Sequence, residues 1–312
     1  MSELILHHYP LSPFSEKIRA MLGYTGLGWQ SVIVSERPPR PLLAPLAGGY
    51  RKIPVAQIGA DVFCDTRTIS REIARLSGRP ELSLEHVSKA EREFVEDTDL
   101  EVFLACILSA GSFALLRKVV KESSLLELGR VLLDRISMGR KARVKAMTPG
   151  QARRRVRRHM AHMENLLTRD FLFGSQPSIA DFSAYHSLWF LCDLAEKPWL
   201  DDFPIVAAWM ERMRAFGHGQ PVEISAEQAL VAAAEAIPRP LSVDSGEPLL
   251  GQPVSIAPVD YGREPVTGVL VGSHRHGWVV SRKDDELGDI HVHLPRQGFV
   301  MQPLANQPPP AS

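Results

Sequence analysis

A serine and a proline mark the point where an apolar segment gives way to a helical pattern, in the stretch YPLSPFSEKIR at residues 9–19. Ser12 is a preferred N-cap residue and Pro13 a preferred first helical residue, so the pair predicts the start of a helix. A helix N-terminus also stabilises a thiolate. Ser12 has no thiol, so this stretch alone leaves two interpretations open: a helix cap, or a site for a thiol that arrives with a ligand.

Two other pairs extend this chemistry. Pro54, in RKIPVAQIG, begins an apparent strand, where it cannot donate to a ladder, and it suggests a cis bond after Ile53. Asp65 and Thr66, in CDTRTISREIA, stand where a strand passes into a helix. Both could cap that helix, but its free N–H groups also suit a carboxylate. The three pairs together indicate a polar ligand site.

The elements that must position these pairs alternate along residues 1–78. Strand patterns occur at 3–9, 29–34, 54–58 and 61–64, and helical patterns at 14–27 and 66–78. This order predicts a small α/β domain. From residue 85 to 216 the apolar residues recur three and four apart, which predicts an all-helical second domain.

The C-terminal part has a different composition. A Pro/Gly-rich connector leads into short β-type runs between turns, and we expect a small antiparallel, barrel-like β module at residues 245–304. Residues 305–312, ANQPPPAS, are expected to be a disordered tail. The sequence does not indicate what the module does.

In order and spacing, residues 3–216 resemble the cytosolic glutathione transferase family. The three pairs carry the resemblance in the first domain. In the second, FLFGSQPSIADFSAYHSLWFL contains a Ser178 to Asp181 capping box, and DDFPIVAAWMERMRAF resembles the family's closing helix. Ser12 followed by Pro-Phe is similar to the serine-type bacterial class. The resemblance implies a thioredoxin-like N-terminal domain followed by an all-α domain.

The resemblance also implies how glutathione would bind. Thr66, through its hydroxyl and backbone N–H, would bind the γ-glutamyl carboxylate, and Asp65 would pair with the amino group. The family usually has Glu at the Asp65 position, so we expect a longer or water-mediated contact here. Ile53, held by cis-Pro54, would bind the cysteinyl backbone.

The remaining site candidates lie at the two ends of the ligand. Arg51 and Lys52 are candidates for the glycyl carboxylate, although such a pair is more often just solvated. Ser12 would donate a hydrogen bond to the thiol sulfur, and Ser15, about one helical turn further, is a candidate to support it.

The activity implied is that of a glutathione transferase, with glutathione as co-substrate and a small hydrophobic electrophile as the second substrate, which the sequence does not identify. The alternative is a non-catalytic protein that uses the same fold for glutathione binding or regulation. A glutathione-dependent reductase or peroxidase is disfavoured, because Ser12 stands where that chemistry needs Cys.

The amino-acid composition limits the classes of binding partner and the cellular compartment that we expect. The 36 Lys plus Arg balance 36 Asp plus Glu, so neither nucleic acid nor an anionic membrane is favoured. Three cysteines in apolar runs indicate a reducing compartment, and no signal or membrane-spanning pattern is present, so we expect a cytoplasmic protein.

A basic run and a pair of histidines are further polar features of the sequence. ARRRVRRH at residues 152–159 is expected to be a solvated or subunit-facing surface, which the acidic run EREFVEDTDLE could pair across the two-fold axis of a homodimer. His291 and His293 would share a strand face, but no further ligand completes a site and no metal is expected.

Overall fold

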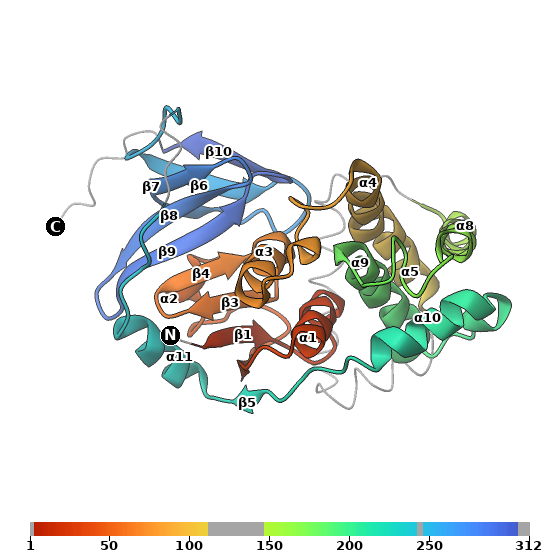
Figure 1. Ribbon diagram of the computed structural model, residues 1–312. Helices are drawn as coiled ribbons and strands as arrows, with labels where there is room; N and C mark the ends of the chain where they lie inside the picture. The colour runs from red at the N-terminus through yellow and green to blue at the C-terminus, as the bar shows by residue number, and fades with distance from the viewer. Residues whose placement is uncertain (1–2, 112–146, 242–245, 305–312) are drawn as a thin grey trace.

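The computed structural model describes residues 3–111, 147–241 and 246–304 (Figure 1). The expected tail at 305–312 lies outside the described residues. Three regions follow one another along the chain: an α/β unit, a group of helices, and a β-rich C-terminal part that returns to the side of the α/β unit (Figure 1).

The α/β unit has the thioredoxin-like arrangement that the resemblance implies. β1 is paired in parallel with β2 and antiparallel with β3, and β3 is antiparallel to β4. Its elements are β1 (Leu4–His8), α1 (Pro13–Thr25), β2 (Trp29–Ile33), α2 (Ala44–Ala47), β3 (Val55–Ile58), β4 (Asp61–Cys64) and α3 (Thr66–Ser77). Gly26 and Gly78, at φ 67° and 66°, end α1 and α3 in the left-handed conformation that glycine adopts without strain.

The helical region is also confirmed over its described residues, while residues 112–146 of the expected range lie outside them. Its described elements are η1 (Pro80–Leu82), α4 (Lys89–Asp97), α5 (Phe103–Ser109), α8 (Pro149–Leu166), α9 (Ile179–Leu188), η4 (Leu200–Asp202) and α10 (Pro204–Arg214), with the π-helical turns η2 (Thr98–Val102) and η3 (Trp189–Leu194). The α9 helix is buried along its whole length and packs against α1. One apolar core therefore joins these helices to the α/β unit.

The C-terminal strands are antiparallel to one another, as expected, but they do not close into a separate barrel. They are β6 (Pro253–Pro258), β7 (Val266–His274), β8 (Gly277–Asp284), β9 (Gly288–Pro295) and β10 (Phe299–Pro303), preceded by β5 (Val222–Glu223) and α11 (Ala226–Ala234). β9 pairs in parallel with β4, giving one open ten-stranded sheet in the order β10-β6-β7-β8-β9-β4-β3-β1-β2-β5.

The strand pairing explains why the β-rich part joins the α/β unit. Without β9, β4 would present a free edge of backbone donors and acceptors. Beside the ladder, His293 on β9 donates to the carboxylate of Asp61 on β4 over 2.7 Å. The apolar side chains of both parts also form one cluster, with Val62 and Val292 fully buried in it. The β-rich part thus shares a core with the α/β unit.

No helix of the described residues is long and apolar enough to cross a membrane.

Candidate functional site

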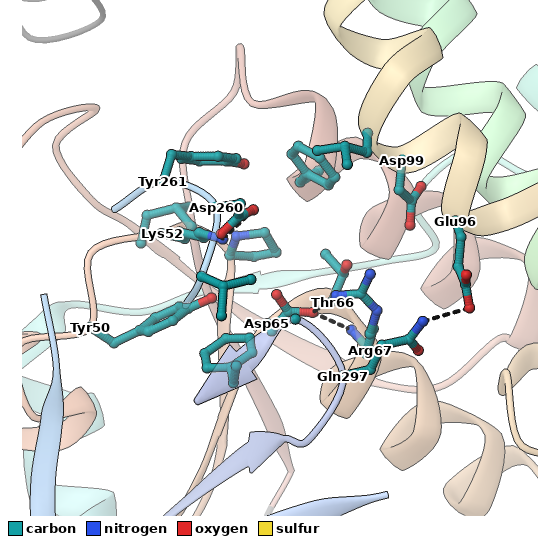
Figure 2. Close-up of a pocket in the computed structure, with 17 residues that line it drawn as sticks. Tyr50, Lys52, Asp65, Thr66, Arg67, Glu96, Asp99, Asp260, Tyr261 and Gln297 are labelled. Atoms are coloured by element: carbon teal, nitrogen blue, oxygen red, sulfur yellow. Dashed lines mark hydrogen bonds and ion pairs between the residues drawn. The ribbon is translucent and has the colours of Figure 1, made fainter. Parts of the chain in front are cut away.

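A pocket of about 270 Å³ lies where the α/β unit, the α4–η2 helix and two C-terminal loops meet. Figure 2 shows its polar side chains pointing inward from several directions. Five of the residues singled out from the sequence line it: Lys52, Ile53, Pro54, Asp65 and Thr66.

Local backbone geometry aims these residues at the pocket. The Ile53–Pro54 bond is cis, as expected, immediately before β3. Asp65 is the N-cap of α3 at φ 77°, a conformation that costs a non-glycine residue on the order of 1–3 kcal/mol. Its Oδ1 accepts from the backbone N–H of Arg67 at 3.0 Å. Thr66 begins the helix, where backbone N–H groups have no partner within the helix.

Three buried polar atoms of residues that line the pocket have no hydrogen-bond partner among the described residues. They are Oη of the buried Tyr50, Nε of Arg67 and Oδ1 of Asp99. Two are donors and one is an acceptor. Buried polar atoms are normally hydrogen-bonded, so this arrangement suits a polar ligand or ordered water.

Ser12 lies beside the pocket rather than among its lining residues. It caps α1, is 2% exposed, and its Oγ accepts from the backbone N–H of Ser15 at 3.2 Å. Phe14, two residues further on, does line the pocket. A hydroxyl that accepts one hydrogen bond still has its own proton to donate, so capping and donation to a ligand are compatible.

Four further residues singled out from the sequence do not line the pocket. Arg51 forms an ion pair with Glu264 at 2.9 Å, and the buried Ser15 lies inside the first turn of α1. Ser178 and Asp181 form the expected capping box at the start of α9.

Asp181 does more than cap its helix. It also accepts from the Leu172 N–H at 3.0 Å and from Trp209 Nε1 at 2.9 Å. Burial raises the pKa of its carboxyl to about 6, although these donors oppose the shift. Asp181 therefore organises the helical core at a distance from the pocket.

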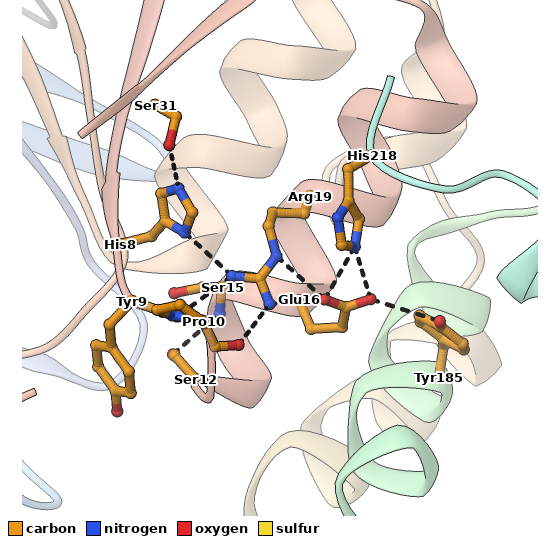
Figure 3. A network of polar contacts seen from close by, with 10 residues as sticks. All are labelled: His8, Tyr9, Pro10, Ser12, Ser15, Glu16, Arg19, Ser31, Tyr185 and His218. Carbon is orange, nitrogen blue, oxygen red and sulfur yellow. Dashed lines mark hydrogen bonds and ion pairs between the residues drawn. The ribbon is translucent and has the colours of Figure 1, made fainter. Parts of the chain in front are cut away.

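The loop that presents Ser12 is held by a polar network that the sequence did not indicate (Figure 3). The guanidinium of Arg19 donates to the carbonyl oxygens of Tyr9 and Pro10 at 3.2 and 2.9 Å, and to Nδ1 of His8 at 3.0 Å. Burial, followed by the charge of Arg19, lowers the pKa of His8 to about 3, so the ring is neutral. The main chain just before Ser12 is thereby fixed to α1.

Glu16 holds the guanidinium of Arg19 in place. Its carboxylate accepts from Arg19 at 2.7 Å, from His218 Nε2 at 3.0 Å and from Tyr185 Oη at 3.4 Å (Figure 3). Burial alone would raise the pKa of this carboxyl, but the hydrogen bonds and charges of His218 and Arg19 outweigh burial and lower it. The network therefore links the Ser12 loop to α9 and to the segment after α10.

Charges in the pocket differ from the sequence expectation because the C-terminal loops contribute to it. Asp260 pairs with Lys52, Tyr261 and Phe299 complete one wall, and Gln297 donates to Glu96 on α4. The sequence does not indicate these contacts, because Asp260 lies 208 positions after Lys52 and Gln297 lies 201 positions after Glu96.

The charged surface motifs also have partners within the chain. Arg155 pairs with Asp97 and lies 3.9 Å from Glu101, so part of the basic and acidic runs meets in the same chain. His293 is engaged by Asp61, and the described residues contain no group of three or more side chains arranged to hold a metal ion.

Two protein-family models match parts of this chain. Residues 6–81 match the glutathione S-transferase N-terminal domain, and residues 128–212 match the glutathione S-transferase C-terminal domain. A crystal structure of a GST-like protein from Pseudomonas syringae is 35% identical and covers 97% of this chain and 100% of its own, with a TM-score of 0.77. The chain belongs to the glutathione S-transferase family.

Within the family, similarity extends beyond the enzymes' two usual domains. Because the Pseudomonas syringae protein aligns over 97% of this chain, its similarity includes the C-terminal β strands. A curated relative, FtsZ-localized protein A from Caulobacter vibrioides, is 29% identical over 223 residues, which cover 68% of this chain and 87% of that protein. The chain is therefore also similar to a protein that is named for its localisation with FtsZ.

Proposed function

We propose that this chain binds a glutathione-type thiol in the pocket and activates it for transfer to a small hydrophobic electrophile. The observation that carries the proposal is the meeting of cis-Pro54 with Asp65 and Thr66 in one pocket. The N-terminus of α3 would receive the γ-glutamyl carboxylate, Asp65 the amino group, and the Ile53 backbone the cysteinyl unit. Tyr50 and Arg67 offer further donors.

Ser12 would supply the chemical step. Lowering a thiol pKa from about 8.5 to about 6.5 requires about 2.7 kcal/mol of preference for the thiolate. One hydrogen bond to a charged group contributes about 1.5–3 kcal/mol, and the helix N-terminus adds a fraction. The Ser12 hydroxyl at the N-terminus of α1 is therefore sufficient to lower the thiol pKa by this amount, and no separate base is needed.

The electrophile would bind on the helical side of the same pocket. Phe14 and the partly exposed Leu100 line that side, and the Phe14 ring packs edge-on against Phe103 with centroids 4.8 Å apart. This apolar wall is the reason for proposing a hydrophobic second substrate.

A second candidate function is glutathione binding without turnover, in a regulatory protein. Two observations favour it: Ser12 lies outside the pocket lining, and the loops of the C-terminal β-rich part provide one pocket wall. The similarity to FtsZ-localized protein A points the same way.

A homodimer and a cytoplasmic location are part of both proposals, and sedimentation velocity tests the dimer.

The deciding experiment measures binding and turnover separately. Calorimetric titration with glutathione tests the pocket, and conjugation of 1-chloro-2,4-dinitrobenzene tests transfer. Ser12→Ala is expected to reduce turnover at least tenfold, whereas Ser225→Ala, the N-cap of the distant α11, leaves it unchanged. Binding without turnover would favour the regulatory candidate. Absence of binding by any glutathione-type thiol would remove the thiol assignment.

A further inference from the structure

The cation nearest the expected glycyl end of the ligand is already neutralised by the chain itself. Nζ of Lys52 lies 2.7 and 2.9 Å from the two carboxylate oxygens of Asp260, and 4.2 Å from the ring centre of Tyr261. The Lys52 side chain is only 13% exposed. Figure 2 shows these three side chains together at one end of the pocket.

The loop that carries Asp260 is fitted to this place. Gly262, at φ 60°, lies so close to the neighbouring stems that a Cβ there would be 3.4 Å from Cγ of Lys52 and 3.6 Å from Cδ of Arg51. Glu264, at the far side of the same loop, pairs with Arg51 at 2.9 Å. Packing and charge therefore both hold the loop against the Arg51–Lys52 stretch.

With the residues of this loop included, carboxylates outnumber cations among the side chains that line the pocket. Its lining includes four carboxylates and two cations, namely Asp65, Glu96, Asp99 and Asp260 with Lys52 and Arg67. Glutathione itself carries two carboxylates and one ammonium. A free glycyl carboxylate beside Lys52 would lie against Asp260 and gain little from a cation that is already paired.

We propose that Asp260 sets the specificity of the pocket for a γ-glutamyl thiol whose C-terminal carboxylate is capped, as an amide or an amine conjugate. A carboxamide fits the Lys52–Asp260 pair on both sides: its oxygen accepts from Lys52 and its N–H donates to Asp260. The inference rests on the proposed thiol-binding function and names the ligand class for that same pocket.

The test compares glutathione with glutathione amide, its C-terminal carboxamide, by calorimetric titration of the full chain at neutral pH and physiological salt. The wild type is expected to bind the amide at least tenfold more tightly. Asp260→Asn is expected to remove that preference by strengthening glutathione binding about tenfold. Glu264→Gln, which removes a carboxylate of the same loop outside the pocket lining, is the matched control and keeps the wild-type preference.

The outcomes separate the two proposals. Equal or tighter binding of glutathione by the wild type, or an unchanged preference in Asp260→Asn with an unchanged melting temperature, would overturn the specificity role and leave thiol binding intact. If Glu264→Gln shifts the preference as much as Asp260→Asn, general charge and not Asp260 is responsible, which also overturns it. If neither thiol binds the wild type or Asp260→Asn, the proposed function itself fails.

Discussion

Lys17 of α1 and Asp99 of η2 form a buried ion pair between the α/β unit and the helices, with Nζ 2.9 Å from Oδ2. Their side chains are 2% and 9% exposed. Lys17 also donates to Ser183 at 2.7 Å. Burial alone would raise the pKa of Asp99, but the charge of Lys17, the charges of His186 and Arg67 and the hydrogen bond from Lys17 together outweigh burial and lower the pKa, so the carboxyl of Asp99 is ionised.

This pair predicts a strongly non-additive response. Lys17→Met leaves a buried carboxylate without its partner and is expected to lower the free energy of unfolding by about 3–5 kcal/mol. Lys17→Met combined with Asp99→Leu is expected to recover most of that loss, because it removes both charges. Urea unfolding of the two single variants and the double variant measures the coupling. Additive losses would show that the pair does not act as a unit.

Buried and half-buried histidines predict acid sensitivity. Burial is the main cause that lowers the pKa to about 4 or about 3 in five rings, those of His7, His8, His159, His186 and His274. Below about pH 6.5 the histidines of the unfolded chain bind protons, whereas the same rings in the folded chain do not. The contribution of these neutral rings to the free energy of unfolding is therefore fully present above that pH and falls as the pH decreases towards 4. Asp181, with its raised pKa, acts in the opposite direction over about pH 4 to 6.

Helix α8 offers a matched test of this pH dependence. His159 is buried and stacks on Phe94 with centroids 5.2 Å apart, whereas His162 on the same helix is exposed. His159→Leu is expected to flatten the loss of unfolding free energy between pH 7 and pH 5, and His162→Gln to leave it almost unchanged. Denaturant midpoints at the two pH values measure both. Equal slopes in all three proteins would contradict the assignment.

Arg19 is expected to be a positioning residue for Ser12, on the basis of the proposed function. Arg19→Met releases the carbonyl oxygens of Tyr9 and Pro10 and should reduce kcat/KM about tenfold with little change in thiol affinity. The kinetic pKa of the bound thiol should move up towards that of the free thiol. Arg75→Met, which alters an exposed partner of Glu72, is the control. A loss of affinity with an unchanged kinetic pKa would argue against positioning.

The β-rich part is expected to be required for folding. Its removal, as a chain ending at residue 241, exposes the β4 edge and the apolar side chains that pack against Val292 and its neighbours. We expect aggregation or loss of a cooperative melting transition, whereas a chain ending at residue 304 behaves like the full protein. Light scattering and calorimetric melting distinguish the two. A soluble, cooperatively melting chain of residues 1–241 would show an independent α/β and helical unit.

The sequence predicted most of the α/β and helical architecture because local signals specify it. Ser12, Pro54 and Asp65 each act through backbone geometry at their own position, so their signals are visible in a few neighbouring residues. The cap formed by Ser178 and Asp181 is local in the same way.

The remainder depended on contacts between distant segments. Nothing near Lys52 in the sequence indicates that Asp260 neutralises it, and the alternation in β9 is equally compatible with a small barrel and with pairing onto β4. The Arg19 and Lys17 pairs were missed because isolated charged residues in a helix are usually solvated, and only tertiary packing buries these.

The ten-stranded sheet changes which part of the molecule is open to unwanted strand pairing. β9 covers β4 on one side and β5 covers β2 on the other, so no strand of the α/β unit is an edge. Among the described strands, the edges that remain are β5, with only two residues, and β10, which ends at Pro303. A very short strand and a proline are both poor templates for another chain. The C-terminal strands thus also protect the molecule against edge-to-edge aggregation.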